Sequence, residues 1–258
     1  MNEAIETNGV RRSVRVLQTW FPEVGAGGFT ALDGSIEFYG RVQALLRPEM
    51  HVLDFGAGRG AALLDDPVAF RRDLRRFKGR VARVVACDVD EAVLSNPGAD
   101  ERLVIPLDAG LPFADNAFDL IVSDFVFEHV TNPALVSAEL RRILKPGGWL
   151  CARTPNKYCP VSLVTRLIHN SGHTKILRWA QPNRREIDVF PTAFKLNSKR
   201  DLDAWFPVET FTHFTYRYEP EPGYFFNNRH VLALMLVVAW LLPPVMKTNL
   251  FIFLRKRS

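Results

Sequence analysis

The stretch HVLDFGAGRG, which runs from His51 to Gly60, constrains the fold of this chain more than any other. A short apolar run leads into three glycines at alternate positions, Gly56, Gly58 and Gly60. Glycines at a strand-to-helix turn let the backbone approach a ligand closely and enter the next helix tightly. No Gly-Lys-Ser/Thr follows, which excludes a P-loop, but the relaxed dinucleotide pattern GxGxx(G/A) is satisfied. The turn therefore predicts a ligand site and leaves the ligand open.

The rest of the chain alternates between short apolar runs and helical spacing. Runs that predict strands lie at 52–53, 81–86, 103–105, 118–122 and 149–152, and helical spacing lies between the turn and about residue 77 and at 133–144. This alternation predicts an α/β fold, a doubly wound parallel sheet with helices on both faces. Further on, the pattern predicts a helix at 198–206 with Ser198 as N-cap, and strands at 208–218 and 249–254.

The 258 residues are enough for one sizeable core with decorations. We expect an N-terminal lead-in at 1–35 and one main domain at 36–258. Within that domain we expect a core at 40–156, a proline-containing, loop-rich cap insertion at 157–197, and a C-terminal part at 198–258 that includes the apolar segment 231–246.

Charge and cysteine content narrow the class of protein. The net charge is +5, which suits an anionic partner such as nucleic acid or an acidic membrane surface, or a merely solvated basic face. Aromatic residues are not interleaved with a basic strand in a recognisable module, which speaks against nucleic acid. The three cysteines form no CxxC pair, so we expect neither a metal site nor a disulfide. No secretory signal is visible, so we expect a cytoplasmic protein.

Acidic residues at the predicted strand ends indicate the ligand. Asp54 would repel a pyrophosphate beside the turn but attract the ammonium of a methionine moiety. Asp88 ends the second predicted strand, where a carboxylate can accept both ribose hydroxyls of an adenosine. Asp108 follows the third strand and could accept from the adenine N6 amine, and Asp124 ends the fourth. Together these residues favour an adenosyl ligand that carries a positive charge.

Four motifs in order resemble those of the class I S-adenosylmethionine-dependent methyltransferases, in the type 11 group related to ubiquinone and menaquinone methylases. They read HVLDFGAGRG, VVACDVD, LDAGLPFADNAFDLIVSDFVFEHV and ELRRILKPGGWLCARTPN. The resemblance covers residues 40–156 well and extends loosely to the end. It implies a Rossmann-like, seven-stranded sheet that is mostly parallel with an antiparallel last strand. The link from the glycine turn to Asp88 is longer than usual in that group.

The resemblance also implies S-adenosylmethionine as cofactor and assigns roles to matching positions. Asp54, Gly56 and Gly58 would face the methionine and ribose part. Asp88 with Val89 would hold the ribose, and Asp108 with the backbone of Ala109 would hold adenine. Asp124, or its neighbour Phe125, would line the methionine end.

Candidates for chemistry on the acceptor are fewer. His129 follows the fourth strand and can titrate near neutrality, so it is a candidate general base, although a histidine at a helix entry is often structural. Asn156 and Tyr158 follow the fifth strand and are candidate substrate contacts. We expect direct methyl transfer to an oxygen, with alignment of the reacting atoms and exclusion of water as the main tasks of the protein.

The acceptor is predicted only as a class: a small molecule, a glycan or a lipid-linked compound. Residues 231–242 form a twelve-residue apolar run. As a helix it spans roughly 18 Å, too short for a bilayer core of about 30 Å. It is either a helix buried on the sheet or a shallow peripheral contact at the inner face of the membrane, with Arg255–Arg257 near acidic headgroups. An NAD-binding oxidoreductase and a noncatalytic module with the cofactor fold remain as alternatives.

Overall fold

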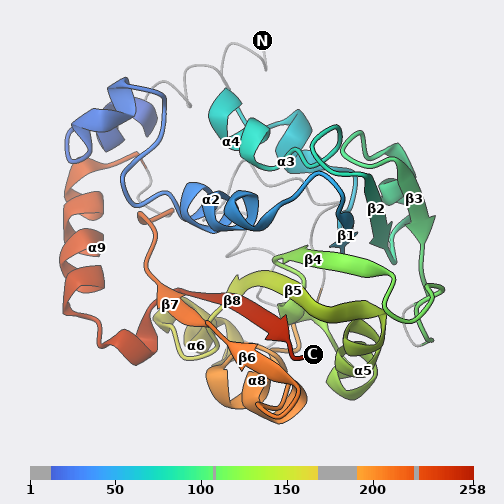
Figure 1. The fold of residues 1–258 in the computed structure, drawn as a ribbon. Helices are drawn as coiled ribbons and strands as arrows, with labels where there is room; N and C mark the ends of the chain where they lie inside the picture. The colour runs from blue at the N-terminus through green and yellow to red at the C-terminus, as the bar shows by residue number, and fades with distance from the viewer. Residues whose placement is uncertain (1–12, 107–108, 168–190, 224–226) are drawn as a thin grey trace.

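The computed structural model describes residues 13–106, 109–167, 191–223 and 227–258 (Figure 1). The strands are β1 (His51–Phe55), β2 (Arg83–Asp88), β3 (Glu101–Val104), β4 (Phe118–Asp124), β5 (Leu144–Pro155), β6 (Phe211–His213), β7 (Tyr216–Tyr218) and β8 (Asn249–Lys256). The helices are α2 (Gly34–Leu45), α3 (Ala61–Leu64), α4 (Ala69–Leu74), α5 (Pro133–Ile143), α6 (Pro160–Leu167), α8 (Lys199–Trp205) and α9 (Arg229–Leu241), with 3-10 turns η1 (Pro22–Gly25), η2 (Glu91–Ser95), η3 (Phe127–His129) and η5 (Pro244–Met246).

The strands form one sheet in the order β3-β2-β1-β4-β5-β8-β6, and β7 also pairs with β8. The first five strands are parallel, whereas β8 is antiparallel to β5 and both β6 and β7 are antiparallel to β8. The predicted Rossmann-like, mostly parallel sheet with an antiparallel last strand is confirmed. The predicted strand 208–218 is interrupted at Phe214–Thr215, so eight strands occupy the seven expected positions.

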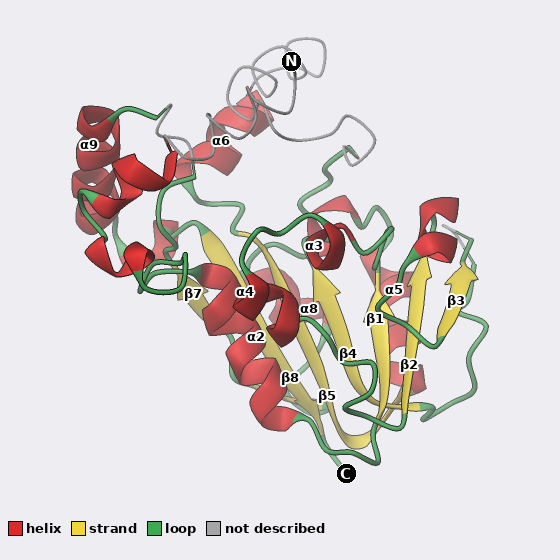
Figure 2. Ribbon diagram, turned by 90° about the horizontal axis from the view of Figure 1, so that it is seen from above, coloured by secondary structure: helices red, strands yellow, loops and turns green. Residues whose placement is uncertain are grey.

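Helices cover both faces of the sheet (Figure 2). Successive side chains of a strand point to opposite faces, so each strand contributes to two cores. Phe38 and Val42 of α2 pack with Val52 and Leu120 on one face. On the other face, Leu140 of α5 and Leu202 of α8 pack with the alternate strand residues, among them Leu53, Ile121 and Leu150.

The helix boundaries follow from local sequence. Ser198 accepts a hydrogen bond from the backbone N–H of Asp201 at 3.2 Å, which confirms it as the N-cap of α8. The predicted helical stretch before residue 77 is two short helices, α3 and α4. Pro67 lies between them, and a proline disfavours helical conformation in the residue before it.

The regions outside the core contain further elements. Within the predicted lead-in, residues 13–18 are helical and are followed by η1. The described part of the predicted insertion contains α6, so it is not made of loops alone. The apolar C-terminal segment forms α9, which stands beside the N-terminal helix at one side of the molecule (Figure 1).

Candidate functional site

The glycine turn lies against the carboxyl end of β2. The backbone N–H groups of Gly56 and Ala57 both donate to the carbonyl of Cys87, at 2.8 and 3.1 Å. The N–H of Gly58 donates to Oδ2 of Asp88 at 2.8 Å, and Asp90 N–H donates to Oδ1 at 3.0 Å. The turn and the acidic strand end, which are thirty residues apart in the sequence, are therefore held together.

The backbone of the turn has a conformation that requires glycine. Gly56 has φ +76°, and a Cβ there would lie 2.3 Å from Cγ2 of Val126. Asn96 supports the loop from below: its amide donates to the carbonyls of Ala57 and Gly58, at 3.2 and 3.1 Å. Asn96 is buried, and a Cβ on Gly60 would lie 2.7 Å from its Oδ1. Sequence reasoning missed Asn96, because only the fold brings it under the turn.

Three carboxylates, those of Asp54, Asp88 and Asp124, belong to residues at the ends of neighbouring strands at this edge. Burial of Asp54, together with the negative charges of Asp124 and Asp88, raises its pKa to about 7. Within the described part of the chain, the side-chain carboxylate of Asp54 has no hydrogen-bond or ion-pair partner. A ligand that brings positive charge to this position would lower the pKa and stabilise the ionised form. The residues present therefore fit the ammonium and sulfonium of S-adenosylmethionine.

Asp124 differs from Asp54 because it already has a cationic partner. Arg153 of β5 donates to both of its carboxylate oxygens, and the hydroxyl of Tyr39 donates to Oδ2 at 2.9 Å. Burial alone would raise the pKa of Asp124, but Arg153 lowers it below its usual value. Asp124 thus lies at the predicted edge, but its charge is neutralised by a residue that the sequence reasoning did not identify.

The residue after β4 has a strained backbone. Phe125 has φ +56°, which is rare for a bulky residue. Its N–H donates to the carbonyl of Arg153 at 2.9 Å, and the Arg153 guanidinium lies 4.8 Å from the centre of its ring. Strained residues of this kind cluster at functional sites, which is consistent with the predicted place of Phe125 at the methionine end.

Comparisons with known proteins agree with this geometry. Residues 53–152 match the family model described as a methyltransferase domain. Over residues 53–152 the chain is similar to an S-adenosylmethionine-dependent methyltransferase domain. S-adenosylmethionine is accordingly the cofactor of this family, as the glycine turn and the acidic strand ends predicted.

Curated relatives match part of the chain. The ubiquinone/menaquinone biosynthesis C-methyltransferase UbiE of Paracoccus denitrificans is 37% identical over 113 residues, which cover 40% of this chain and 42% of the relative. UbiE of Paraburkholderia xenovorans is 30% identical over 156 residues, covering 58% and 60%. The chain therefore spans less than two thirds of the length of these relatives.

Solved structures resemble the fold over most of the chain. The complex between the Haloferax volcanii Trm112 methyltransferase activator and a putative methyltransferase gives a TM-score of 0.52 at 16% identity, covering 87% of this chain and 90% of that chain. The [4+2]-cyclase SpnF also gives 0.52 at 16% identity, covering 86% and 80%. At this identity the likeness shows the fold alone, and a shared fold does not determine the reaction.

In the methyltransferase domain, His129 lies in η3, close after β4. Its Nδ1 is 2.8 Å from the carbonyl of Pro191, and because a carbonyl only accepts, Nδ1 carries the proton. Its Nε2 is 3.9 Å from Oε1 of the buried Glu128. Glu128 is itself oriented by the hydroxyl of Thr154, which donates to Oε2 at 2.8 Å. This tautomer leaves Nε2 as a proton acceptor, which a general base requires.

The other predicted residues have different surroundings. Asn156 is 1% exposed, and its amide donates to the carbonyls of Val245 and Lys247 at 2.9 and 2.8 Å. We assign it a structural role and leave it out of the proposed site. Tyr158 and Val89 are exposed, at 38% and 42%, and Ala109 is also exposed.

Two further predictions concern Asp108 and the three cysteines. Asp108 lies outside the described residues. Cys87, Cys151 and Cys159 are all buried and free. No group of three or more potential metal ligands occurs in the described ranges.

Proposed function

We propose that this protein transfers a methyl group from S-adenosylmethionine to a small-molecule, glycan or lipid-linked acceptor. The cofactor supplies an electrophilic methyl group next to a positively charged sulfur. The observation that carries the proposal is the arrangement of Asp54 and Asp88 around the glycine turn, within residues that match a methyltransferase domain.

Each residue has a proposed task in holding the cofactor. Gly56 and Gly58 allow close approach of the backbone, and Asp88 with Val89 accepts from the ribose. Asp54 faces the methionine ammonium because its carboxylate has no other cationic partner among the described residues. Asp108 and Ala109 are proposed to contact adenine.

Asp124 is proposed to act less directly than Asp54. Its negative charge is balanced by the positive charge of Arg153. Without this pairing, the guanidinium of Arg153 would repel a sulfonium at this edge. The pair therefore lets the strand end remain rigid and electrically neutral beside a cationic ligand. We propose that Asp124 positions the methionine end together with Phe125, rather than binding the ammonium itself.

The reacting atom of the acceptor is proposed as a carbon or an oxygen whose proton must be removed. The sequence led us to expect an oxygen, whereas the UbiE relatives are named C-methyltransferases. Both reactions gain from a base, and we propose Nε2 of His129 for this role, with Glu128 beside it. Tyr158 is proposed as an acceptor contact because it is exposed near the end of β5.

Calorimetric titration with S-adenosylmethionine, S-adenosylhomocysteine and NAD tests the proposal. We expect both adenosyl ligands to bind and NAD not to bind. Asp88→Ala should abolish adenosyl binding, whereas Asp115→Ala, which removes an exposed carboxylate near α5, should leave it unchanged. Binding of NAD would instead favour an oxidoreductase, and adenosyl binding without turnover on any extract would favour a noncatalytic module.

A test of the base uses turnover of labelled cofactor on membrane extracts. His129→Asn should lower the rate of transfer while calorimetry still shows cofactor binding. If transfer by the variant equals that of the parent protein across neutral pH, His129 is not the base.

A further inference from the structure

The helix α9 exposes most of its apolar side chains. Only Leu232 is buried within the helix. The exposed fractions are 64% for Leu234, 53% for Val237, 82% for Trp240 and 65% for Leu241. A helix packed on the sheet would bury these side chains, so the first of the two alternatives that the sequence left open is wrong.

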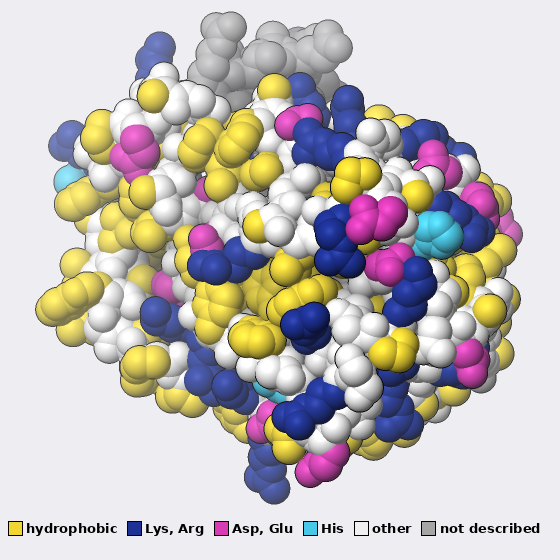
Figure 3. Space-filling model, viewed as in Figure 1, with side chains coloured by type: hydrophobic (Ala, Val, Ile, Leu, Met, Phe, Trp, Pro, Cys, Tyr) yellow, Lys and Arg dark blue, Asp and Glu magenta, His cyan; other side chains and the backbone are white. Residues whose placement is uncertain are grey.

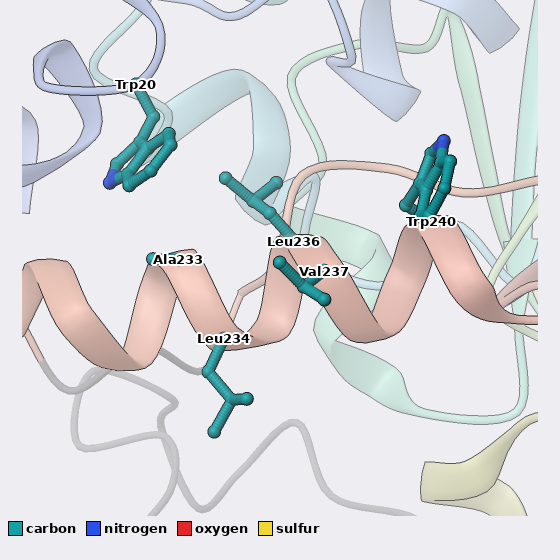
Figure 4. A pocket seen from close by; sticks show the side chains of 6 residues that line it. All are labelled: Trp20, Ala233, Leu234, Leu236, Val237 and Trp240. Carbon is teal, nitrogen blue, oxygen red and sulfur yellow. The ribbon is translucent and has the colours of Figure 1, made fainter.

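A second segment of the chain extends this apolar surface. Trp20, which follows the N-terminal helix, is 50% exposed and lines a shallow hollow together with α9. Figure 4 shows Trp20 and Trp240 on one side of the helix and Leu234 on the other. The apolar surface thus surrounds much of α9 and includes two tryptophans, which favour the boundary between headgroups and acyl chains. We call α9 with Trp20 the α9 surface.

Basic groups border the α9 surface, while the helix itself carries no acidic residue. No charged residue occurs from 231 to 246. The exposed Arg229 and His230 begin the helix, Lys247 follows η5, and the exposed Arg15 lies on the helix that precedes Trp20. Hydrophobic side chains occupy the side of the molecule where α9 stands, with Lys, Arg and His colours near its upper end and fewer Asp and Glu colours between them (Figure 3). An apolar helix with basic ends is typical of binding at the surface of an anionic bilayer.

The segment that follows α9 is tied to the end of β5. The Asn156 amide, directly after β5, donates to the carbonyls of Val245 and Lys247. Thr248, the next residue, donates to Glu219 through both its N–H and its hydroxyl, at 2.7 and 2.6 Å. These contacts hold η5 and the start of β8, which follow α9 in the chain, next to the edge of the sheet where the strands β1, β4 and β5 end. A surface docked through α9 would therefore bring this edge close to the lipid headgroups.

We propose that the α9 surface docks the protein shallowly on a bilayer that contains anionic lipids. The docking itself does not depend on the proposed function. Its consequence, that a lipid-linked acceptor can reach the site from the membrane, rests on that function. No helix in the described ranges is long and apolar enough to cross a bilayer, so the contact is peripheral in form. A second copy of the chain fits less well, because a symmetric contact would place the same basic ends against each other.

The basic C-terminus is not part of this surface. In the antiparallel pairing of β8 with β5, Asn249 lies opposite Pro155 but Arg255 lies opposite Trp149. The six residue steps from Asn249 to Arg255 span roughly 20 Å along the strand. Lys256 donates to the carbonyls of Arg141 and Leu144 at 2.8 and 2.6 Å. The expectation that Arg255–Arg257 would act together with the apolar segment is therefore wrong.

Flotation of the purified full chain with vesicles tests the docking. One set contains phosphatidylcholine alone, and the other contains phosphatidylcholine with phosphatidylglycerol. We expect the protein to float with the anionic vesicles and to bind the neutral ones more weakly. Trp240→Glu and Val237→Glu should each reduce binding by about tenfold or more, because each removes a large apolar group from the membrane contact. Leu94→Glu, at an apolar residue of η2 that is 57% exposed, should have no effect.

Two controls separate the possible failures. Titration with S-adenosylmethionine and circular dichroism show whether each variant is folded, and they test the proposed function independently of vesicle binding. Folded protein that stays in the aqueous fraction with both vesicle types overturns the docking, as does binding that the α9 variants do not weaken. A dimer in sedimentation that Trp240→Glu dissociates would assign the surface to a second copy instead.

Discussion

Replacing Gly56 by alanine tests how tightly the glycine turn is packed against the segment after β4. Gly56 has φ +76°, where an L-residue costs about 1–2 kcal/mol. The new Cβ would also lie 2.3 and 2.8 Å from the two methyl carbons of Val126, an overlap that forces a shift. Overpacking of this kind costs about 1–3 kcal/mol. We therefore expect Gly56→Ala to lower the free energy of unfolding by about 2–5 kcal/mol.

Gly147 provides a matched control for the backbone part. It has the same φ of +76°, but a Cβ there meets nothing within 4 Å. Gly147→Ala should therefore cost only the backbone penalty, about 1–2 kcal/mol. Denaturant unfolding followed by circular dichroism measures both, provided that the slope m is unchanged.

A double-mutant cycle isolates the contact itself. Val126→Ala removes both methyl carbons that Gly56→Ala would strike, so the double variant should recover about 1–3 kcal/mol relative to the sum of the single changes. Additive effects, together with equal costs at the two glycines, would refute the argument that Val126 is what excludes a side chain from the turn.

Three further predictions concern charge and burial. Because the pKa of Asp54 is raised to about 7, the folded protein holds a proton between about pH 4 and 7 that the unfolded chain has lost. The free energy of unfolding therefore falls as pH rises through that range. Asp54→Asn should flatten this pH dependence in thermal unfolding and weaken S-adenosylmethionine binding. Arg153→Gln leaves the buried Asp124 carboxylate without its cationic partner, so it should lower the free energy of unfolding by about 3–5 kcal/mol, measured by chemical denaturation. The loss should be smaller when Asp124→Asn is added, and an equal loss in the double variant would contradict the pairing. Asn156→Ala should lower the free energy of unfolding by about 1–3 kcal/mol, because the carbonyls of Val245 and Lys247 lose their hydrogen-bond donor. An unchanged free energy of unfolding together with weaker acceptor binding would instead support Asn156 as a substrate contact.

Local sequence was sufficient to predict the fold and the cofactor of the family. The glycine turn, the acidic strand ends and the alternation of strands with helices are short-range patterns, and the parallel sheet brings strand ends to one edge whatever the exact packing. Ser198 as a cap and the strand at the C-terminus follow from patterns of the same kind. These features could be predicted because backbone geometry translates each of them directly into structure.

Only the tertiary structure decided the roles that depend on distant partners. Arg153 neutralises Asp124 from the neighbouring strand, and Asn96 supports a turn nearly forty residues before it. The amide of Asn156 donates to a carbonyl almost ninety residues later, and this contact is why we propose a structural role for a polar side chain at the expected place. The exposure of α9 has the same origin: its apolar residues predict a helix but not whether other elements cover it. Burial and pairing are properties of the folded arrangement, and no local pattern encodes them.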